Sequence, residues 1–304
     1  VRTGGLFTLA STATAPDIVV TSADIALASG SRLGLRGTTQ TITLNNLVSS
    51  LMVLGGADRS GAWSLSAAEA LRLAADKQIT FASLRGPTGT AADMLIGDLA
   101  MVYGTSGQIG SGGTIKVLTP SKVTVNGKVD LTTVSASDLF TIDPTRIEVL
   151  ADTGLIAMHD SGGNLLGRLD MVANVISVAT SPLQSGLSGS NTVTNASLQL
   201  GTPSTVPTTL GYLSAGTINL SVGSGLYIQN SGANATFGAR RGFTANNVTI
   251  STGNPSTQIA INGRAQPASG TTLTGALVMS AVSINGTPAN LATGGSFDAL
   301  STIN

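Results

Sequence analysis

The sequence predicts an all-β protein, a parallel β-helix (β-solenoid) with one short helix packed on its flank. Three observations predict this fold: a composition of small, uncharged residues, short apolar runs that alternate with polar ones, and the close spacing of those runs. The 304 residues are 41% hydrophobic and only 10% charged, whereas about 25% of a typical soluble domain is charged. Disordered chains combine low hydrophobicity with high net charge, so this chain folds, around small aliphatic side chains.

The apolar runs have the period of two that marks a strand with one buried face. Each is short, rich in Leu or β-branched residues, and ended by Gly, Asn, Asp, Ser or Pro. The expected strands include Ile18–Val20, Ile25–Leu27, Thr41–Leu44, Ile79–Phe81, Ile115–Leu118, Val123–Val125, Val129–Leu131, Phe140–Ile142, Ile147–Leu150, Leu155–Met158, Val175–Val178, Leu198–Leu200, Ile218–Leu220, Leu226–Ile228, Val248–Ile250, Ile259–Ile261 and a run at Ile284.

The spacing of the runs favours a solenoid. Three short strands for each coil of about 20 residues are expected to stack into a repeat structure. With coils about 4.8 Å apart, the chain would supply roughly 12–15 coils and a rod of about 60–70 Å. An antiparallel sandwich or propeller could use the same turns, but its strands are usually richer in aromatic residues than this chain, which is 3% aromatic.

One segment has helical character. In residues 64–76, Ser66 followed by Glu69 fits a capping box, and Ala67, Ala70 and Leu71 share a helical face. The sequence is expected to form a single solenoid region over 1–304, within a much longer chain. It is interrupted by irregular excursions near 57–78, 86–113 and 181–207.

Five phrases of the chain, in order, resemble a family of very large proteobacterial proteins, the filamentous-haemagglutinin-like or autotransporter-type β-strand-repeat surface proteins. They are Asp17–Asn46, Ser64–Ser83, Ile147–Thr180, Gly225–Thr252 and Gln258–Gly286. The resemblance implies a right-handed parallel β-helix, secretion across the outer membrane, and an extracellular or cell-surface role in filaments.

Composition argues against several functional classes. Basic and acidic residues balance at 15 each with no basic stripe, so no nucleic-acid footprint is expected. Cysteine is absent, which removes thiolate metal sites. The longest apolar window is too short for a transmembrane segment. Neither a cofactor nor a metal is expected, although calcium held by carboxylates stays open.

The enzymatic alternative is a carbohydrate-active β-helix, which needs two or more carboxylates in one groove. The densest acidic patch lies at 138–170, where coils of about 20 residues would align Glu148 with Arg168 and Asp152 with Asp170. The only histidine, His159, stands beside Asp160 before a Gly-rich turn and is interpreted as a surface residue. The patch comprises Asp138, Asp143, Arg146, Glu148, Asp152, Asp160, Arg168 and Asp170.

The sequence therefore predicts a structural or adhesive protein without catalytic residues. It is expected to associate with itself in filaments or arrays, because an uncapped solenoid end is an open sheet edge. Surface glycans or neighbouring cells are further candidate partners. A second alternative is a glycan-binding module with a different all-β fold.

Overall fold

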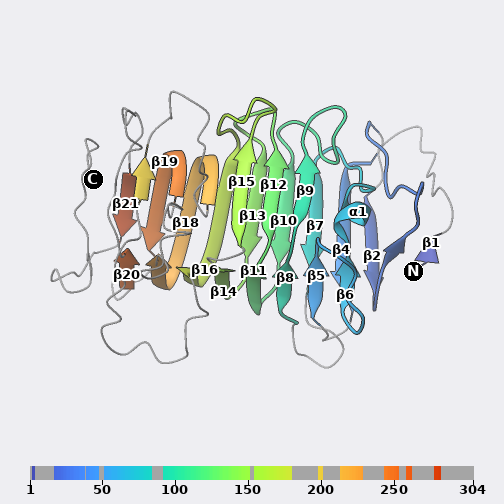
Figure 1. Ribbon diagram of the computed structural model, residues 1–304, viewed down its shortest axis with the longest axis horizontal. Helices are drawn as coiled ribbons and strands as arrows, with labels where there is room; N and C mark the ends of the chain where they lie inside the picture. The colour runs from blue at the N-terminus through green and yellow to red at the C-terminus, as the bar shows by residue number, and fades with distance from the viewer. Residues whose placement is uncertain are drawn as a thin grey trace.

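The structure, a computed structural model, is a rod in which β-strands follow one another from β2 near the N-terminus to β21 near the C-terminus (Figure 1). It describes residues 2–3, 17–37, 39–47, 51–83, 92–150, 154–179, 198–200, 213–228, 243–252, 258–261 and 277–281. Among these residues, all pairings between strands are parallel. The predicted parallel β-helix is confirmed. Sandwiches and propellers consist of antiparallel strands, so this pairing excludes both.

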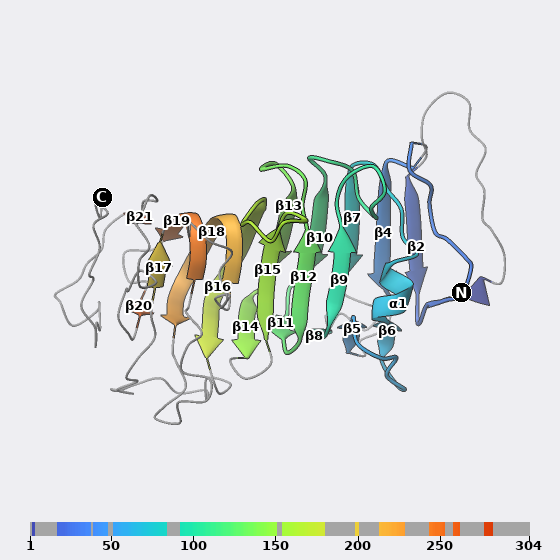
Figure 2. The same cartoon turned by 45° about the horizontal axis from the view of Figure 1, so that its top comes forward.

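The strands stack into three faces, which Figure 2 shows partly one behind another. Face A holds β2 (Ile18–Ser22), β4 (Thr41–Asn46), β7 (Gln78–Ala82), β10 (Thr114–Leu118), β13 (Leu139–Asp143), the first part of β16 (Arg168–Ala179), the middle of β18 (Leu213–Ile228), most of β19 (Phe243–Thr252), and β21 (Leu277–Ala281).

Face B holds β6 (Trp63–Leu65), β5 (Met52–Leu54), β8 (Met94–Ile96), β11 (Lys122–Val125), β14 (Arg146–Leu150), the ends of β16 and β18, and β20 (Gln258–Ile261). Face C holds β9 (Leu99–Val102), β12 (Lys128–Thr132), β15 (Leu155–His159), the starts of β18 and β19, and β17 (Leu198–Leu200). A small separate pair joins β1 (Arg2–Thr3) to β3 (Ala26–Leu27).

Alternation along each strand builds the core. Since successive side chains point to opposite faces of a sheet, every second residue of face A from β4 to the middle of β18 enters the rod and stacks on its counterpart in the next coil. One such column passes through Ile42, Ile79, Ile115, Phe140, Leu169 and Ile218, all fully buried. The outward positions carry Thr, Asn, Lys and Asp instead, which explains how a chain with few charges keeps a polar surface.

The coils are longer than predicted, and the described residues form fewer of them. Along face A, register partners are separated by 24, 37, 36, 25, 29, 49, 30 and 29 residues, taken as differences between their residue numbers. The predicted coil of about 20 residues is therefore wrong. The described strands of face A span about 40 Å at about 4.8 Å for each step, not 60–70 Å. Two of the longer spans contain additional elements, because β6 and helix α1 (Ala67–Ala70) lie between β4 and β7, and β17 lies between β16 and β18.

The regular winding is interrupted after β5. Instead of passing to face C, the chain turns back and places β6 beside β5 on the side away from β8. Helix α1 (Ala67–Ala70) follows and contacts β9, and Figure 2 shows it at the N-terminal end of the row formed by β9, β12 and β15. The excursion therefore covers the edge of face C, which protects that strand from pairing with another chain.

Helix α1 confirms the predicted short helix but is shorter than its predicted span, 64–76. Ser66 is the N-cap, and the Glu69 carboxylate accepts hydrogen bonds from the Ser66 backbone N–H at 2.9 Å and its hydroxyl at 2.8 Å. The chain leaves the helix early because Leu73 and Ala75 make parallel β-bridges to Leu33 and Ile109. Tertiary pairing thus outweighs local helix propensity here.

Two other predicted excursions have different outcomes. The expected irregular segment 86–113 is wrong for residues 94–102, where β8 and β9 are in register with neighbouring coils, whereas residues 104–113 consist mainly of turns and bends. Of the excursion predicted at 181–207, only β17 is among the described residues. The run predicted at Ile284 lies outside them.

Candidate functional site

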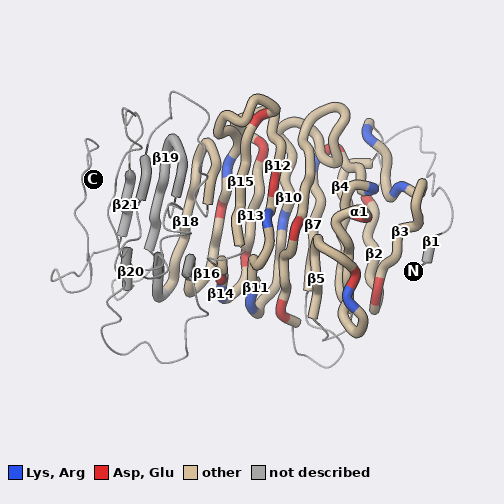
Figure 3. Tube along the Cα trace, viewed as in Figure 1, with Lys and Arg blue, Asp and Glu red and all other residues tan. Residues whose placement is uncertain are grey.

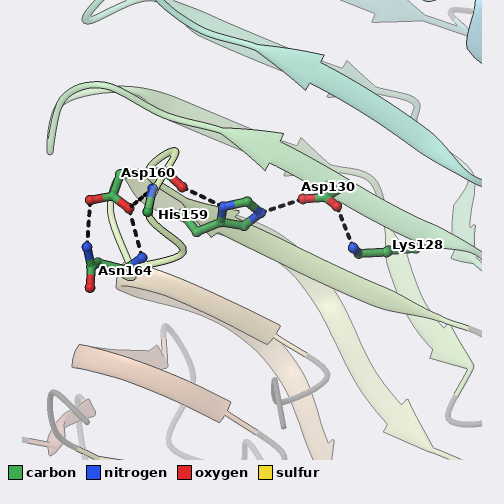
Figure 4. A network of polar contacts seen from close by, with 6 residues as sticks. Lys128, Asp130, His159, Asp160 and Asn164 are labelled. Atoms are coloured by element: carbon green, nitrogen blue, oxygen red, sulfur yellow. Dashed lines mark hydrogen bonds and ion pairs between the residues drawn. The ribbon is translucent and has the colours of Figure 1, made fainter. Parts of the chain in front are cut away.

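The only histidine lies at the centre of a polar network on face C (Figure 4). His159 ends β15, and its ring points outward because the preceding residue, Met158, is fully buried in the core. Its Nε2 lies 2.6 Å from Oδ1 of Asp130, on the neighbouring strand β12, and its Nδ1 lies 2.8 Å from the backbone carbonyl oxygen of Asp160. Since both partners are hydrogen-bond acceptors, an imidazolium, which donates from both nitrogens, satisfies both contacts.

Asp130 is held from two sides. Its Oδ2 forms an ion pair with Nζ of Lys128 on the same strand, while Oδ1 faces His159. Burial acts to raise the pKa of Asp130, but the hydrogen bonds and positive charges of Lys128 and His159 outweigh it, so the pKa lies below its ordinary value. The network thus joins two coils through a charged carboxylate.

Asp160 organises the turn that follows β15. Its Oδ1 accepts hydrogen bonds from the backbone N–H of Gly162 and of Asn164, both at 2.8 Å, and Oδ2 accepts one from the Asn164 side chain at 2.9 Å. The hydrogen bonds from Asn164 are the main cause that lowers the pKa of Asp160. A carboxylate that binds the backbone two residues later is an Asx-turn, so this acid shapes a turn.

The acidic patch predicted at 138–170 does not converge. Arg168 and Asp170 lie on face A, Arg146 and Glu148 on face B, and Asp160 beyond the end of face C. The expected alignment of Glu148 with Arg168 is wrong. Glu148 instead pairs in register with Thr124 and Ser177, because the coils are longer than about 20 residues. Asp152 lies outside the described residues, so its expected alignment with Asp170 stays a prediction.

Two acids of the patch, Glu148 and Asp170, form ion pairs with nearby basic residues. Glu148, which is only 5% exposed, faces Nε of Arg146 at 2.7 Å and Nζ of Lys122 at 3.6 Å. Asp170 faces Arg168 at 3.1 Å and accepts a hydrogen bond from Asn219 at 2.8 Å. Asp143 and Asp170 do share face A on adjacent strands, but these contacts engage the carboxylate of Asp170.

The most buried acid of the patch has a structural role that the sequence did not indicate. Asp138 is 0% exposed and lies in the turn before β13, where it accepts three backbone hydrogen bonds. They come from Gly112 of the preceding coil at 2.6 Å, Val134 at 2.7 Å and Ser135 at 2.9 Å. Three N–H donors hold this side chain inside the turn.

Other acids act in the same way. The residues Glu69, Asp76, Asp93 and Asp98 each accept a backbone N–H from a segment at least 29 residues away in sequence, namely from Leu27, Gly37, Lys122 and Lys128. Turns between faces leave N–H groups without strand partners, and a carboxylate is a strong acceptor for them. In the sequence, each of these residues is a single acid close to an apolar run. This pattern is too common to identify the acids that accept backbone N–H groups from another coil.

The described residues contain neither a group of three or more His, Cys, Asp or Glu side chains arranged to hold a metal ion, nor a helix long and apolar enough to span a membrane. Basic and acidic residues are interspersed along the described part of the rod in Figure 3.

A groove runs across the corner between faces A and B. It has a volume of about 550 Å³ and follows four successive coils, through the turns after β10 and β13 and the middle of β16 and β18. At this corner the four coils contribute Pro120, Pro144, Asn174 and Gly223. The sequence analysis did not predict this groove, because its residues come together only through the observed register.

The comparisons with known proteins found no match: no family model, no curated protein and no solved structure is similar to this chain.

Proposed function

We propose that the protein is a structural rod of an extracellular or bacterial cell-surface filament, and that it acts by associating with further copies of itself. The single observation that carries the proposal is the parallel register, which continues through the described strands of face A from β2 to β21. In a stack of this kind, a terminal strand whose outer edge is not covered has a row of backbone donors and acceptors that is suited to the addition of another chain.

The polar contacts support a structural role. The side chains that could have carried chemistry, His159, Glu148 and Asp138, hold coils or turns together. General acid–base catalysis requires such groups to reach a substrate. Their engagement within the rod therefore favours a scaffold over a carbohydrate-active enzyme.

The surface also suits close packing between rods. Only 10% of the residues are charged, and the outward, partly exposed positions of face A include Thr43, Thr141 and Asn219. Desolvating hydroxyl and amide groups costs less than desolvating charges. The filament-type surface proteins that the sequence resembles would act in this way.

Negative-stain electron microscopy combined with analytical ultracentrifugation over a concentration series tests the proposal. We expect filaments or arrays that grow with concentration, whereas dispersed single particles at the highest concentration would contradict it. Two matched variants distinguish association through the end of the rod from association through its sides. Val19→Lys places a charge on β2, where Val19 is 66% exposed, and Val134→Lys places one in a turn on the side of the rod.

Charges on edge strands oppose strand addition. Association through the end of the rod predicts that Val19→Lys shortens the filaments and Val134→Lys does not. The reverse result indicates lateral contact instead.

A further inference from the structure

We infer that the groove at the corner of faces A and B is a binding site for a neutral, hydroxyl-rich oligosaccharide that lies along the axis of the rod. This inference goes beyond the proposed scaffold role and does not depend on it. The groove follows four coils, and three steps of about 4.8 Å give it a length of about 14 Å, which suits a short linear ligand.

Hydrogen bonds between coils connect residues that line the groove. The hydroxyl of Thr145 donates to the carbonyl oxygen of Pro120 at 2.6 Å, and the carbonyl oxygen of Thr145 accepts the backbone N–H of Asn174 at 2.9 Å. These bonds join three successive coils through residues that line the groove. Preorganisation of this kind lowers the entropy cost of binding.

The lining combines apolar surfaces with hydroxyl and amide groups. Pro120, Pro144 and the 42% exposed Val172 provide apolar contacts, while Ser221 and Asn174 bring polar side chains. A sugar ring has both kinds of surface, C–H groups on its faces and hydroxyls at its rim. A few placed polar groups in a mainly apolar lining are typical of small-ligand sites.

The charge of the groove lining favours neutral over acidic oligosaccharides. Among the groove-lining residues, Asp143 alone is charged. A polymer of uronic acids or sulfated sugars would meet this carboxylate with like charge, which is unfavourable. Neutral hydroxyls can instead donate hydrogen bonds to it.

An extended peptide fits the groove less well. Peptides that bind to sheets add to a strand edge, where free backbone groups give them affinity. The groove crosses the coils at their corner, and the backbone there already pairs between coils, as with Asn174 and Thr145. A chain that uses side-chain hydroxyls does not need a strand edge.

Isothermal titration calorimetry on the whole chain tests the inference, with β-linked neutral hexose oligomers and uronic-acid oligomers of the same length as probes. We expect the neutral oligomer to bind at least about tenfold more tightly. Ser221→Trp fills the groove and should weaken binding by about tenfold or more. Its matched control is Thr21→Trp, because Thr21 occupies the equivalent exposed position on β2, outside the groove.

A second variant tests the charge argument. Asp143→Asn should keep the affinity for the neutral oligomer within about twofold while bringing the uronic-acid oligomer to a similar affinity. The inference is overturned by an absence of heat with both probes, by tighter binding of the uronic-acid oligomer to the unchanged protein, or by equal losses in the two Trp variants. Microscopy of the same samples reports self-association separately, so failure of one proposal is distinguishable from failure of the other.

Discussion

The Nε2 atom of His159 and the Oδ1 atom of Asp130 lie 2.6 Å apart although the two residues belong to different coils. Register places His159 opposite Thr132, so its ring reaches diagonally across the sheet to the carboxylate two residues earlier. Diagonal pairs of this kind are within reach of long side chains. The only imidazole of the chain thereby becomes a contact between coils.

This contact predicts a pH dependence of stability. Because the pKa of Asp130 is lower in the folded protein than its ordinary value of 3.8, its contribution is present above that value and is lost as the pH falls through the folded pKa. Asp130→Asn should lower the free energy of unfolding by about 0.5–1 kcal/mol near neutral pH, and the difference should vanish in acid. Urea unfolding from pH 2 to pH 7 measures it.

The exposed acid Asp17 provides the control for this measurement. Asp17→Asn should change the unfolding free energy less than Asp130→Asn at neutral pH. A difference between wild type and Asp130→Asn that grows as the pH falls would contradict the assignment.

Glu69 is expected to stabilise the N-terminal end of the rod. It is 5% exposed, and its two carboxylate oxygens accept the backbone N–H groups of Leu27 at 2.6 Å and Ser66 at 2.9 Å. Burial acts to raise the pKa of Glu69, but these hydrogen bonds outweigh it and lower the pKa. In Glu69→Gln one oxygen becomes an NH₂ donor that faces an N–H, so the unfolding free energy should fall by about 1–3 kcal/mol.

Thermal and urea unfolding of Glu69→Gln test this loss, and Asp58→Asn is the matched control. Burial and the negative charge of Glu69 raise the pKa of Asp58, so the charged form of Asp58 is disfavoured in the folded state above its ordinary pKa. Removing that charge should leave stability at pH 7 unchanged or slightly higher. Equal losses in both variants would refute the role of Glu69.

Substitutions at two adjacent glycines allow the energetic cost of backbone strain to be measured separately from that of steric overlap. Gly55 and Gly56 follow β5 with φ of +77° and +67°. A Cβ on Gly55 would overlap the carbonyl oxygen of Asp98, whereas one on Gly56 meets open space. Gly56→Ala should cost about 1–2 kcal/mol from the left-handed backbone alone, and Gly55→Ala clearly more. Urea denaturation measures the loss of unfolding free energy in both variants. Equal losses would contradict the prediction, because they would mean that the neighbouring coil moves aside to accommodate the added Cβ.

Asp138 and Asp160 offer a contrast between a buried and an exposed turn acid. Asp138→Ala leaves three N–H groups without their acceptor, including that of Gly112 in the preceding coil. A buried unsatisfied donor costs about 1–3 kcal/mol, so the rod should lose at least that much stability. Asp160→Ala leaves its donors in contact with water and should cost less. Circular dichroism during urea unfolding measures both, and similar losses would contradict the contrast.

Much of the fold was predictable because alternation is a local property. The runs at Ile115–Leu118 and Phe140–Ile142 have one apolar side chain at every second position, and both form strands. The strands β5 and β8 were missed because Met52–Leu54 and Met94–Ile96 are uniformly apolar and show no alternation. Such runs are buried on both sides or partly covered, and periodicity does not distinguish them from other core segments.

The site was less predictable because it depends on register. Whether Glu148 meets Arg168 or Arg146 is decided by the number of residues in each turn, and turn length leaves no periodic signal. The same holds for the corner groove, whose lining residues are about 25–50 positions apart in sequence, in keeping with the spacing of repeat structures. Asp143 is the one charged residue of the lining, in keeping with the low charged fraction of the whole chain.

The unequal coils also separate the size of the molecule from its length. A coil of 24 residues and one of 49 advance the rod by the same inter-strand step of about 4.8 Å. The length of the rod therefore depends on the number of coils and not on the number of residues in each. Residues inserted at a corner between faces change the outline of the rod without changing the distance between its two ends. Genetic insertions or tags placed at these corners would decorate the rod at fixed, known heights.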